Sequence, residues 1–246
     1  MSIPKIIHYC WFGGGPIGEA DRKCMESWKK YCPDYKIIEW NEQNFEISAN
    51  RYAQQAYEAK KYAFVSDYVR LAVLYEYGGI YLDTDVELVR PLDELLELPG
   101  FMGFQTNNEV ATGLGFGARK GNSVVQALLR DYDALDFLKA DGSADLTPCP
   151  ERNTRVLQAL GVRKDGTRQS IAEMEIFPAE YFCPMDFYSR ELRVTPKTYS
   201  IHRYAESWKP KPSAVSRILQ RLLKKHYYTW YCPLRGRIEG RLRKRT

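Results

Sequence analysis

Short apolar runs alternate with helical patterns at the start of the chain. Residues 3–12 are rich in β-branched and aromatic side chains, and the loop-forming residues 13–16 follow them directly, which predicts a buried strand that leads into a loop. Apolar residues then recur at helical spacing over 19–31, and Pro33 ends that helix before the strand-like 35–40. The pattern predicts a β-α-β opening, and ligands gather at the strand ends of such sheets.

The same alternation continues through the middle of the chain. Residues 51–77 are predicted to be helical in two pieces, the second beginning near Ala63, and a Gly-Gly pair supplies a C-terminal stop. The apolar strand 80–82 follows and leads directly into Asp83 and Asp85. The sequence therefore predicts two carboxylates at the carboxyl end of a buried strand.

Beyond residue 100 the pattern is weaker. Strands are expected at 101–104 and 175–178 and a helix at 123–138, whereas 139–170 is polar and poorly periodic. Hydrophobic residues make up 44% of the 246 residues and charged residues 27%, which is ordinary for a folded soluble protein. We expect one large α/β domain with a substantial core.

The C-terminal end carries an excess of positive charge. Of the 36 Lys and Arg residues, 11 lie in 211–246 beside the single acid Glu239, which leaves 25 basic against 30 acidic residues in 1–210. Within this tail, residues 213–231 place apolar side chains on one stripe flanked by Lys and Arg, as in an amphipathic helix. The division predicts a folded domain over 1–210 and a basic appendage over 211–246 that seeks a polyanionic surface.

Neither export nor a membrane span is indicated. The N-terminal apolar run is short and has no secretory cleavage site, and no stretch approaches the ~18 apolar residues that cross a bilayer. The six cysteines form no C-x-x-C pair, which argues against a zinc knuckle or a redox motif. We expect a cytoplasmic protein with reduced thiols.

The most specific motif of the chain lies between residues 66 and 85. It reads Ser66-Asp67-x-x-Arg70, then a helix, then Gly-Gly-x-Tyr81-Leu-Asp83-x-Asp85. With the opening residues 3–11 and the late His202 and Ser207-Trp208, this motif resembles the sugar-binding D-x-D region of family 32 glycosyltransferases, and distantly the clostridial glucosylating toxins. The resemblance implies a GT-A fold, which is a Rossmann-like mixed sheet flanked by helices.

The resemblance also implies a metal-dependent enzyme. By similarity, Asp85 ligates Mn²⁺ or Mg²⁺, Asp83 contacts the ribose or a metal-bound water, and His202 is a further candidate ligand. Carboxylate oxygens suit these cations, which neutralise the charge that develops on a nucleoside diphosphate leaving group. Asp67 and Arg70 lie three residues apart on one helix face, where we expect contacts with sugar hydroxyls and phosphate. The candidate catalytic residues are therefore Asp67, Arg70, Asp83 and Asp85.

The candidate donor-binding residues come from several parts of the chain. Trp11 is expected to stack on the base, and Asn108 lies where a family residue near the donor falls. The complete set is His8, Trp11, Ser66, Asp67, Arg70, Tyr81, Asp83, Asn108, Ser207 and Trp208. Structural roles stay open for several of them, since a lone Trp is often a core aromatic, Tyr81 suits strand packing, and a single histidine such as His202 is usually structural.

The resemblance implies transfer of a hexose, with retention of configuration, from a UDP-linked donor to a glycan acceptor. Related bacterial enzymes act in capsule or O-antigen synthesis, where a polyprenyl diphosphate carries the acceptor. The basic tail 213–246 agrees, because such a helix binds anionic membranes, and this would bring the protein to the inner face of the cytoplasmic membrane. A tail docked on the catalytic domain stays open. Nucleic acid is not expected, because no recognition module accompanies the basic residues.

Three other functions compete for the same residues. One is a degenerate sugar- or nucleotide-binding protein without catalysis. Another is a haloacid-dehalogenase phosphatase, which also uses an Asp-x-Asp pair with a nucleophilic first Asp. That family has Thr or Val at the position that Glu87 occupies in this sequence. The third is dinucleotide binding, since Gly113-x-Gly115-x-x-Ala118 matches that fingerprint. This match lies in mid-chain, after a poor strand, which argues against it.

Overall fold

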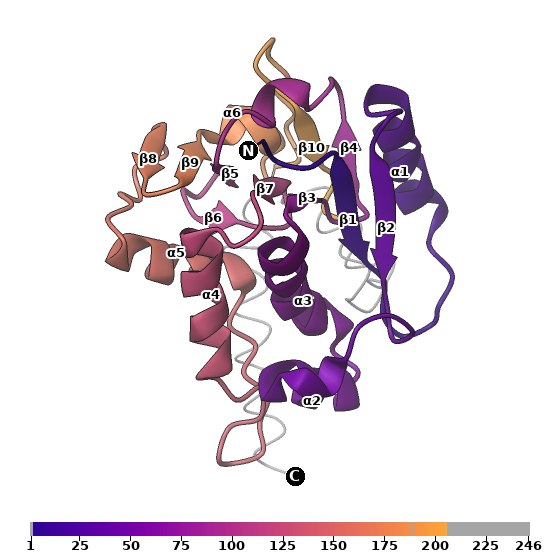
Figure 1. Cartoon of the computed structure of the whole chain (residues 1–246), viewed down its shortest axis with the longest axis vertical. Helices are drawn as coiled ribbons and strands as arrows, with labels where there is room; N and C mark the ends of the chain where they lie inside the picture. The colour runs from indigo at the N-terminus through magenta and orange to yellow at the C-terminus, as the bar shows by residue number, and fades with distance from the viewer. Residues whose placement is uncertain (1, 188, 206–246) are drawn as a thin grey trace. The chain divides into compact units, whose positions relative to one another are not determined.

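The computed structural model of the chain describes residues 2–187 and 189–205 (Figure 1). The chain divides into two compact units, Met1–Met185 with Arg193–Trp208, and Asp186–Leu192 with Lys209–Thr246. The first unit contains every helix and strand named below. Ser207, Trp208 and the tail 211–246 lie outside the described residues, so the division at residue 210 stays a prediction.

A mixed sheet forms the centre of the first unit. Its strands run in the order β2-β1-β3-β7-β5-β9-β8, and β6 pairs with β5. The strands are β1 (Ile6–Cys10), β2 (Lys36–Trp40), β3 (Gly79–Tyr81), β5 (Gly100–Phe104), β6 (Val110–Ala111), β7 (Phe116–Ala118), β8 (Gln169–Ile171) and β9 (Met174–Phe177). β1 is parallel to both β2 and β3, whereas β7 is antiparallel to β3 and β5. The predicted α/β class with a mixed sheet is confirmed.

Helices surround this sheet. The α-helices are α1 (Glu19–Tyr31), α2 (Arg51–Glu58), α3 (Tyr62–Tyr77), α4 (Ser123–Asp133), α5 (Cys149–Ala159) and α6 (Ala179–Phe182), and the 3-10 turns are η1 (Ile47–Ala49) and η2 (Asp93–Leu95). In Figure 1, α3 runs beside α4, and α2 lies across their lower ends. Within the described part of the chain, none of the helices has both the length and the apolar character of a membrane span.

A separate two-stranded sheet stands next to the main one. It consists of β4 (Val86–Leu88) and β10 (Ser200–His202), which are antiparallel, with His202 opposite Val86. The apolar pattern did not predict either strand, because each is only three residues long and β4 follows the two aspartates directly. This small sheet brings the end of the described chain beside the residues that follow β3.

Helix α3 is buried on most of its circumference. Its buried residues include apolar side chains such as Leu71 and Leu74, and also Asp67 and Arg70. A helix that is apolar all round belongs inside a domain, and α3 packs against both α2 and α4. Polar side chains on α3 therefore have to find protein partners, and this requirement shapes the site.

The polar stretch 139–170 contains a helix that the sequence pattern did not predict. Helix α5 begins at Cys149, with Pro148 as its N-cap, and its buried residues are mostly polar: Cys149, Arg152, Asn153, Thr154 and Leu157. Apolar periodicity is the main sequence signal for a helix, and a buried face of this composition does not carry it. The predicted helix 123–138 is also shorter, since α4 ends at Asp133.

One buried tryptophan connects α1 to β4 and offers a test of this packing. Trp28 is fully buried, and its Nε1–H donates to the Val86 carbonyl at 2.7 Å. Trp28→Phe removes this donor, and we expect a loss of about 1–3 kcal/mol in the free energy of unfolding, because the carbonyl is left without that partner. Urea denaturation measures the change. Tyr77→Phe, at a half-exposed residue, is the control, and equal losses in both variants would contradict the role of the hydrogen bond.

Candidate active site at the D-x-D turn

The two aspartates of the motif lie on a tight turn after β3. The Asp83 N–H donates to the Gly113 carbonyl at 3.2 Å, and the Val86 N–H donates back to the Asp83 carbonyl at 3.0 Å. The chain therefore turns around Thr84 before β4 begins. The turn stands at the carboxyl end of β3, the end at which ligands bind in α/β sheets.

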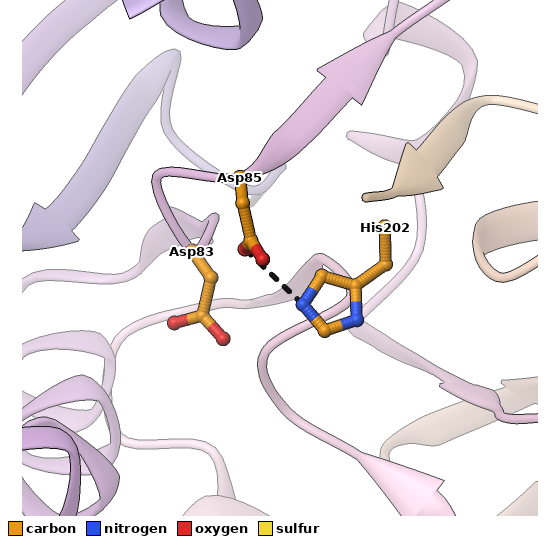
Figure 2. A group of neighbouring side chains, drawn as sticks. All are labelled: Asp83, Asp85 and His202. Atoms are coloured by element: carbon orange, nitrogen blue, oxygen red, sulfur yellow. Dashed lines mark ion pairs between the residues drawn. The ribbon is translucent and has the colours of Figure 1, made fainter. Parts of the chain in front are cut away.

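Asp85 faces a histidine from the far end of the described chain. His202 Nε2 lies 3.1 Å from Asp85 Oδ1 (Figure 2), and the Ala205 N–H donates to Asp85 Oδ2 at 2.7 Å. Burial raises the pKa of Asp85, but the His202 imidazole and the Ala205 N–H outweigh it and lower the pKa to about 2. Asp85 is therefore a carboxylate at neutral pH, and the same pairing raises the pKa of His202.

Asp83 belongs to a buried ionic group around Arg70. The Arg70 Nη2 atom lies 3.1 Å from Asp83 Oδ1 and 3.2 Å from Asp67 Oδ1. The Tyr81 hydroxyl donates to Asp83 Oδ1 at 3.0 Å, and the centroid of the Tyr81 ring lies 4.9 Å from Arg70 Cζ. Burial raises the pKa of Asp83, and it raises the pKa of Asp67 to about 6, although Arg70 opposes both shifts.

This arrangement differs from a surface ion pair. The side chains of Arg70 and Asp67 are only 7% and 12% exposed. A buried pair has lost its hydration, so removing one partner is far more costly than at a surface. Arg70 links the Ser-Asp-x-x-Arg element on α3 to the D-x-D turn after β3, two parts of the motif that are separate in the sequence.

Asp83, Asp85 and His202 form a set that fits a divalent cation. One oxygen or nitrogen atom from each lies within 4.8 Å of the others, and Figure 2 shows the three side chains gathered in one place. Two carboxylates with one imidazole suit a cation such as Mn²⁺, which accepts oxygen and nitrogen ligands. His202 Nδ1 is buried and has no hydrogen-bond partner among the described residues. These residues could hold the cation that the resemblance implies.

The other predicted donor-binding residues have varied surroundings. His8 is fully buried, where its Nε2 meets the Gly78 carbonyl at 2.9 Å and its Nδ1 accepts from Trp40 at 3.0 Å. Burial lowers the pKa of His8 to about 4, so His8 is neutral and holds β1 against the end of α3. This geometry gives His8 a structural role.

The side chains of Trp11, Ser66 and Asn108 contact residues other than those of the ionic group around Arg70. Trp11 follows β1, is partly exposed, and donates its Nε1–H to the Gly15 carbonyl at 2.5 Å. Ser66 donates to the Tyr62 carbonyl within α3. Asn108 has a φ of 62° in the turn between β5 and β6, next to Gly166. Ser207 and Trp208 lie outside the described residues.

Gly113 belongs to the site, and the sequence pattern indicated it for a different reason. A Cβ added at Gly113 would lie 2.0 Å from Asp83 Oδ2 and 3.2 Å from Arg70 Nη1, so only glycine fits here without displacing these groups. The glycine-rich stretch leads into β7 and not into a helix. A dinucleotide fingerprint requires a helix N-terminus for the pyrophosphate, and this context excludes that alternative.

Comparison with known proteins identifies the segment around the turn. Residues 18–101 match a family described as a glycosyltransferase sugar-binding region containing a DXD motif. The inositol phosphoceramide mannosyltransferase 3 of Schizosaccharomyces pombe is 31% identical over 144 residues, which are 55% of this chain and 39% of that protein. The human alpha-1,4-N-acetylglucosaminyltransferase is 28% identical over 148 residues, 60% of this chain and 38% of that protein. The chain thus spans about two fifths of these relatives.

Among solved structures, the PaToxG glycosyltransferase is similar with a TM-score of 0.47 and 21% identity, over 64% of this chain and 69% of that one. The matched segment 18–101 contains α3, the Ser-Asp-x-x-Arg element and the complete D-x-D turn. Residues 18–101 of this chain are thus similar to the glycosyltransferase sugar-binding regions that contain the DXD motif.

Proposed function

We propose that this protein is a metal-dependent glycosyltransferase that moves a hexose from a nucleoside diphosphate sugar to a glycan acceptor. The observation that carries the proposal is the convergence of three side chains within 4.8 Å: Asp83 and Asp85, which follow β3 inside the matched segment 18–101, and His202, which comes from β10 outside it. The relatives named above are glycosyltransferases, and both transfer hexose-type sugars by their names.

The charges around the turn suit such a donor. When bound, a divalent cation supplies the positive charge that stabilises a departing nucleoside diphosphate. Asp85 and His202 would hold it, and Asp83 would contact the cation or a water on it. The Arg70 guanidinium carries N–H donors that match phosphate and hydroxyl oxygens. Asp67, when ionised, accepts from a sugar hydroxyl.

The proposed donor base and acceptor follow from the family resemblance and from the names of the relatives. A UDP-linked hexose follows from the resemblance, as does retention of configuration. The fission yeast relative has a lipid-linked substrate in its name, which agrees with an acceptor carried on a lipid, such as a polyprenyl diphosphate in capsule or O-antigen synthesis. Trp11 stays the proposed platform for the base, because its indole is partly exposed at the end of β1.

Replacing one carboxylate tests the metal role. Asp85→Ala removes the most strongly ionised ligand, and we expect a loss of at least about 100-fold in Mn²⁺-dependent sugar transfer, since a bound cation contributes several kcal/mol to the transition state. Circular dichroism should be unchanged. Asp141→Ala, in an exposed loop, is the control. Transfer by Asp85→Ala at the wild-type rate would refute the metal role.

A panel of thermal shifts identifies the donor class and separates the alternatives. UDP, GDP and their common sugar conjugates are each tested with Mn²⁺ and with EDTA, because a ligand at 100 times its dissociation constant stabilises by ~2.7 kcal/mol. A shift that needs Mn²⁺ supports the donor proposal. Binding without any transfer to acceptor or water would favour a degenerate binding protein instead.

The close approach of Gly113 gives a second test of the site. Gly113→Ala forces the Asp83 carboxylate to move, because the new Cβ would lie 2.0 Å from its Oδ2. We expect the Mn²⁺-dependent nucleotide shift to fall on the order of 10-fold in affinity, as when groups that orient a ligand are lost. Gly100→Ala is the matched control, since it crowds Met174 and Glu173 away from the site. An equal loss of nucleotide affinity in both variants would contradict this reading.

The basic tail is proposed to bind anionic membrane at the inner face of the cytoplasmic membrane. Removal of 213–246 should lower recovery with phosphatidylglycerol vesicles, because each basic residue near such a surface adds ~1 kcal/mol. Transfer to a soluble acceptor should be much less affected. Lys224→Glu with Lys225→Glu, in the complete chain, should reproduce the loss on these vesicles and not on neutral ones. Unchanged vesicle recovery would argue for a tail that docks on the catalytic domain.

A further inference from the structure

Three buried polar side chains form a hydrogen-bonded group next to Arg70. Asn153 donates its Nδ2–H to Thr112 Oγ1 at 3.1 Å and to Cys149 Sγ at 3.2 Å. Thr112 Oγ1 in turn lies 3.2 Å from Cys149 Sγ. The three side chains come from α5 and from the residue after β6, and all three residues are at most 6% exposed. We call this group the Thr112–Cys149–Asn153 triangle.

The triangle touches the guanidinium of the site directly. Arg70 Nη1 lies 3.9 Å from Cys149 Sγ, within the longer range of hydrogen bonds to sulfur. Arg70 Nε donates to the Ser66 carbonyl at 3.1 Å, and Nη2 serves Asp67 and Asp83. Hydrogen bonds to Ser66, Cys149 and Asp83 use three of the five N–H groups of the guanidinium, and Asp67 adds an ion pair at Nη2. The other two N–H groups have no hydrogen-bond partner among the described residues.

Both ends of the triangle are fixed to the fold. Thr154, next to Asn153 on α5, accepts from the Val110 N–H of β6 at 2.8 Å and donates to the Pro150 carbonyl at 2.6 Å. Thr112 is followed by Gly113, whose missing side chain makes room for Asp83. Helix α5 and strand β6 are thus joined where they meet the site, so a movement of α5 would be transmitted to Arg70.

A purely structural role explains this group less well. The triangle occupies the buried face of an 11-residue helix, where apolar side chains would fill the space without needing partners. Asn153 Oδ1 is buried and has no hydrogen-bond partner among the described residues, which is unfavourable for stability. Burial raises the pKa of the Cys149 thiol to about 12, so Cys149 keeps its S–H and does not act as a nucleophile.

We infer that Thr112, Cys149 and Asn153 are positioning residues that hold the Arg70 guanidinium in one orientation, so that its remaining N–H groups can donate to the donor sugar or its phosphate. The inference rests on the proposed function for the identity of the ligand. It assigns a specific role to α5, which lies outside the matched segment 18–101. Donor recognition would then depend on two parts of the chain, the D-x-D segment and α5.

The experiment compares two replacements at one residue. Cys149→Ala removes the contact with Arg70, whereas Cys149→Ser keeps a hydrogen-bonding group of similar size. We expect Cys149→Ala to raise KM for the nucleotide sugar on the order of 10-fold, with a smaller change in kcat, and Cys149→Ser to restore most of the loss. Cys32→Ala is the control, because Cys32 is equally buried at the end of α1. Asn153→Leu fills the space without polar groups and should resemble Cys149→Ala.

A spectroscopic measurement separates this inference from the proposed function. In ¹⁵N-labelled protein, the Arg70 Nε–H resonance, assigned by its absence in Arg70→Lys, should be protected from exchange with water in the wild type and in Cys149→Ser. It should exchange faster in Cys149→Ala and Asn153→Leu. An unchanged resonance in those two variants would overturn the inference. Absence of nucleotide binding in the wild type would instead overturn the proposed function, and the resonance would still test the positioning.

Discussion

The site depends on the burial of one guanidinium. Arg70 lies inside the domain between Asp67 and Asp83, and a buried charge is stable only when opposite charges and hydrogen bonds compensate for its lost hydration. This requirement fixes the helix α3, the strand that ends in the D-x-D turn and the glycine that passes next to them. Burial raises the pKa of both Asp67 and Asp83, and the nearby Arg70 guanidinium opposes the two shifts. The same contacts therefore set both the geometry and the charge of the turn.

The parts of the fold that the sequence predicted are those with a clear apolar period. Helix α1 has the predicted bounds, and β1 and β2 lie within the predicted strands. The α3 motif was recognisable because Gly78 and Gly79, the strand and the two aspartates follow one another without interruption. Here local sequence and tertiary structure require the same conformation.

The parts that were missed depend on contacts between distant residues. The buried face of helix α5 is mostly polar. Its hydrogen-bond partners come from Thr112, Val110 and Arg70, which are distant in the sequence, so no local pattern reveals the helix. His8 was predicted to bind the donor from its place in the motif alone, which did not reveal that Gly78 and Trp40 contact its two ring nitrogens. Gly113 drew notice as part of a fingerprint, although its function is to leave room for Asp83.

The small sheet of β4 and β10 has a consequence for how the protein is made. It delivers His202 to Asp85 across more than a hundred residues of chain. During synthesis the amino-terminal parts of a chain emerge first, so Asp83 and Asp85 leave the ribosome long before their histidine. A nascent chain that stops before β10 carries the D-x-D motif without the imidazole. The order of synthesis thus delays the complete set of Asp83, Asp85 and His202 until β10 has been made.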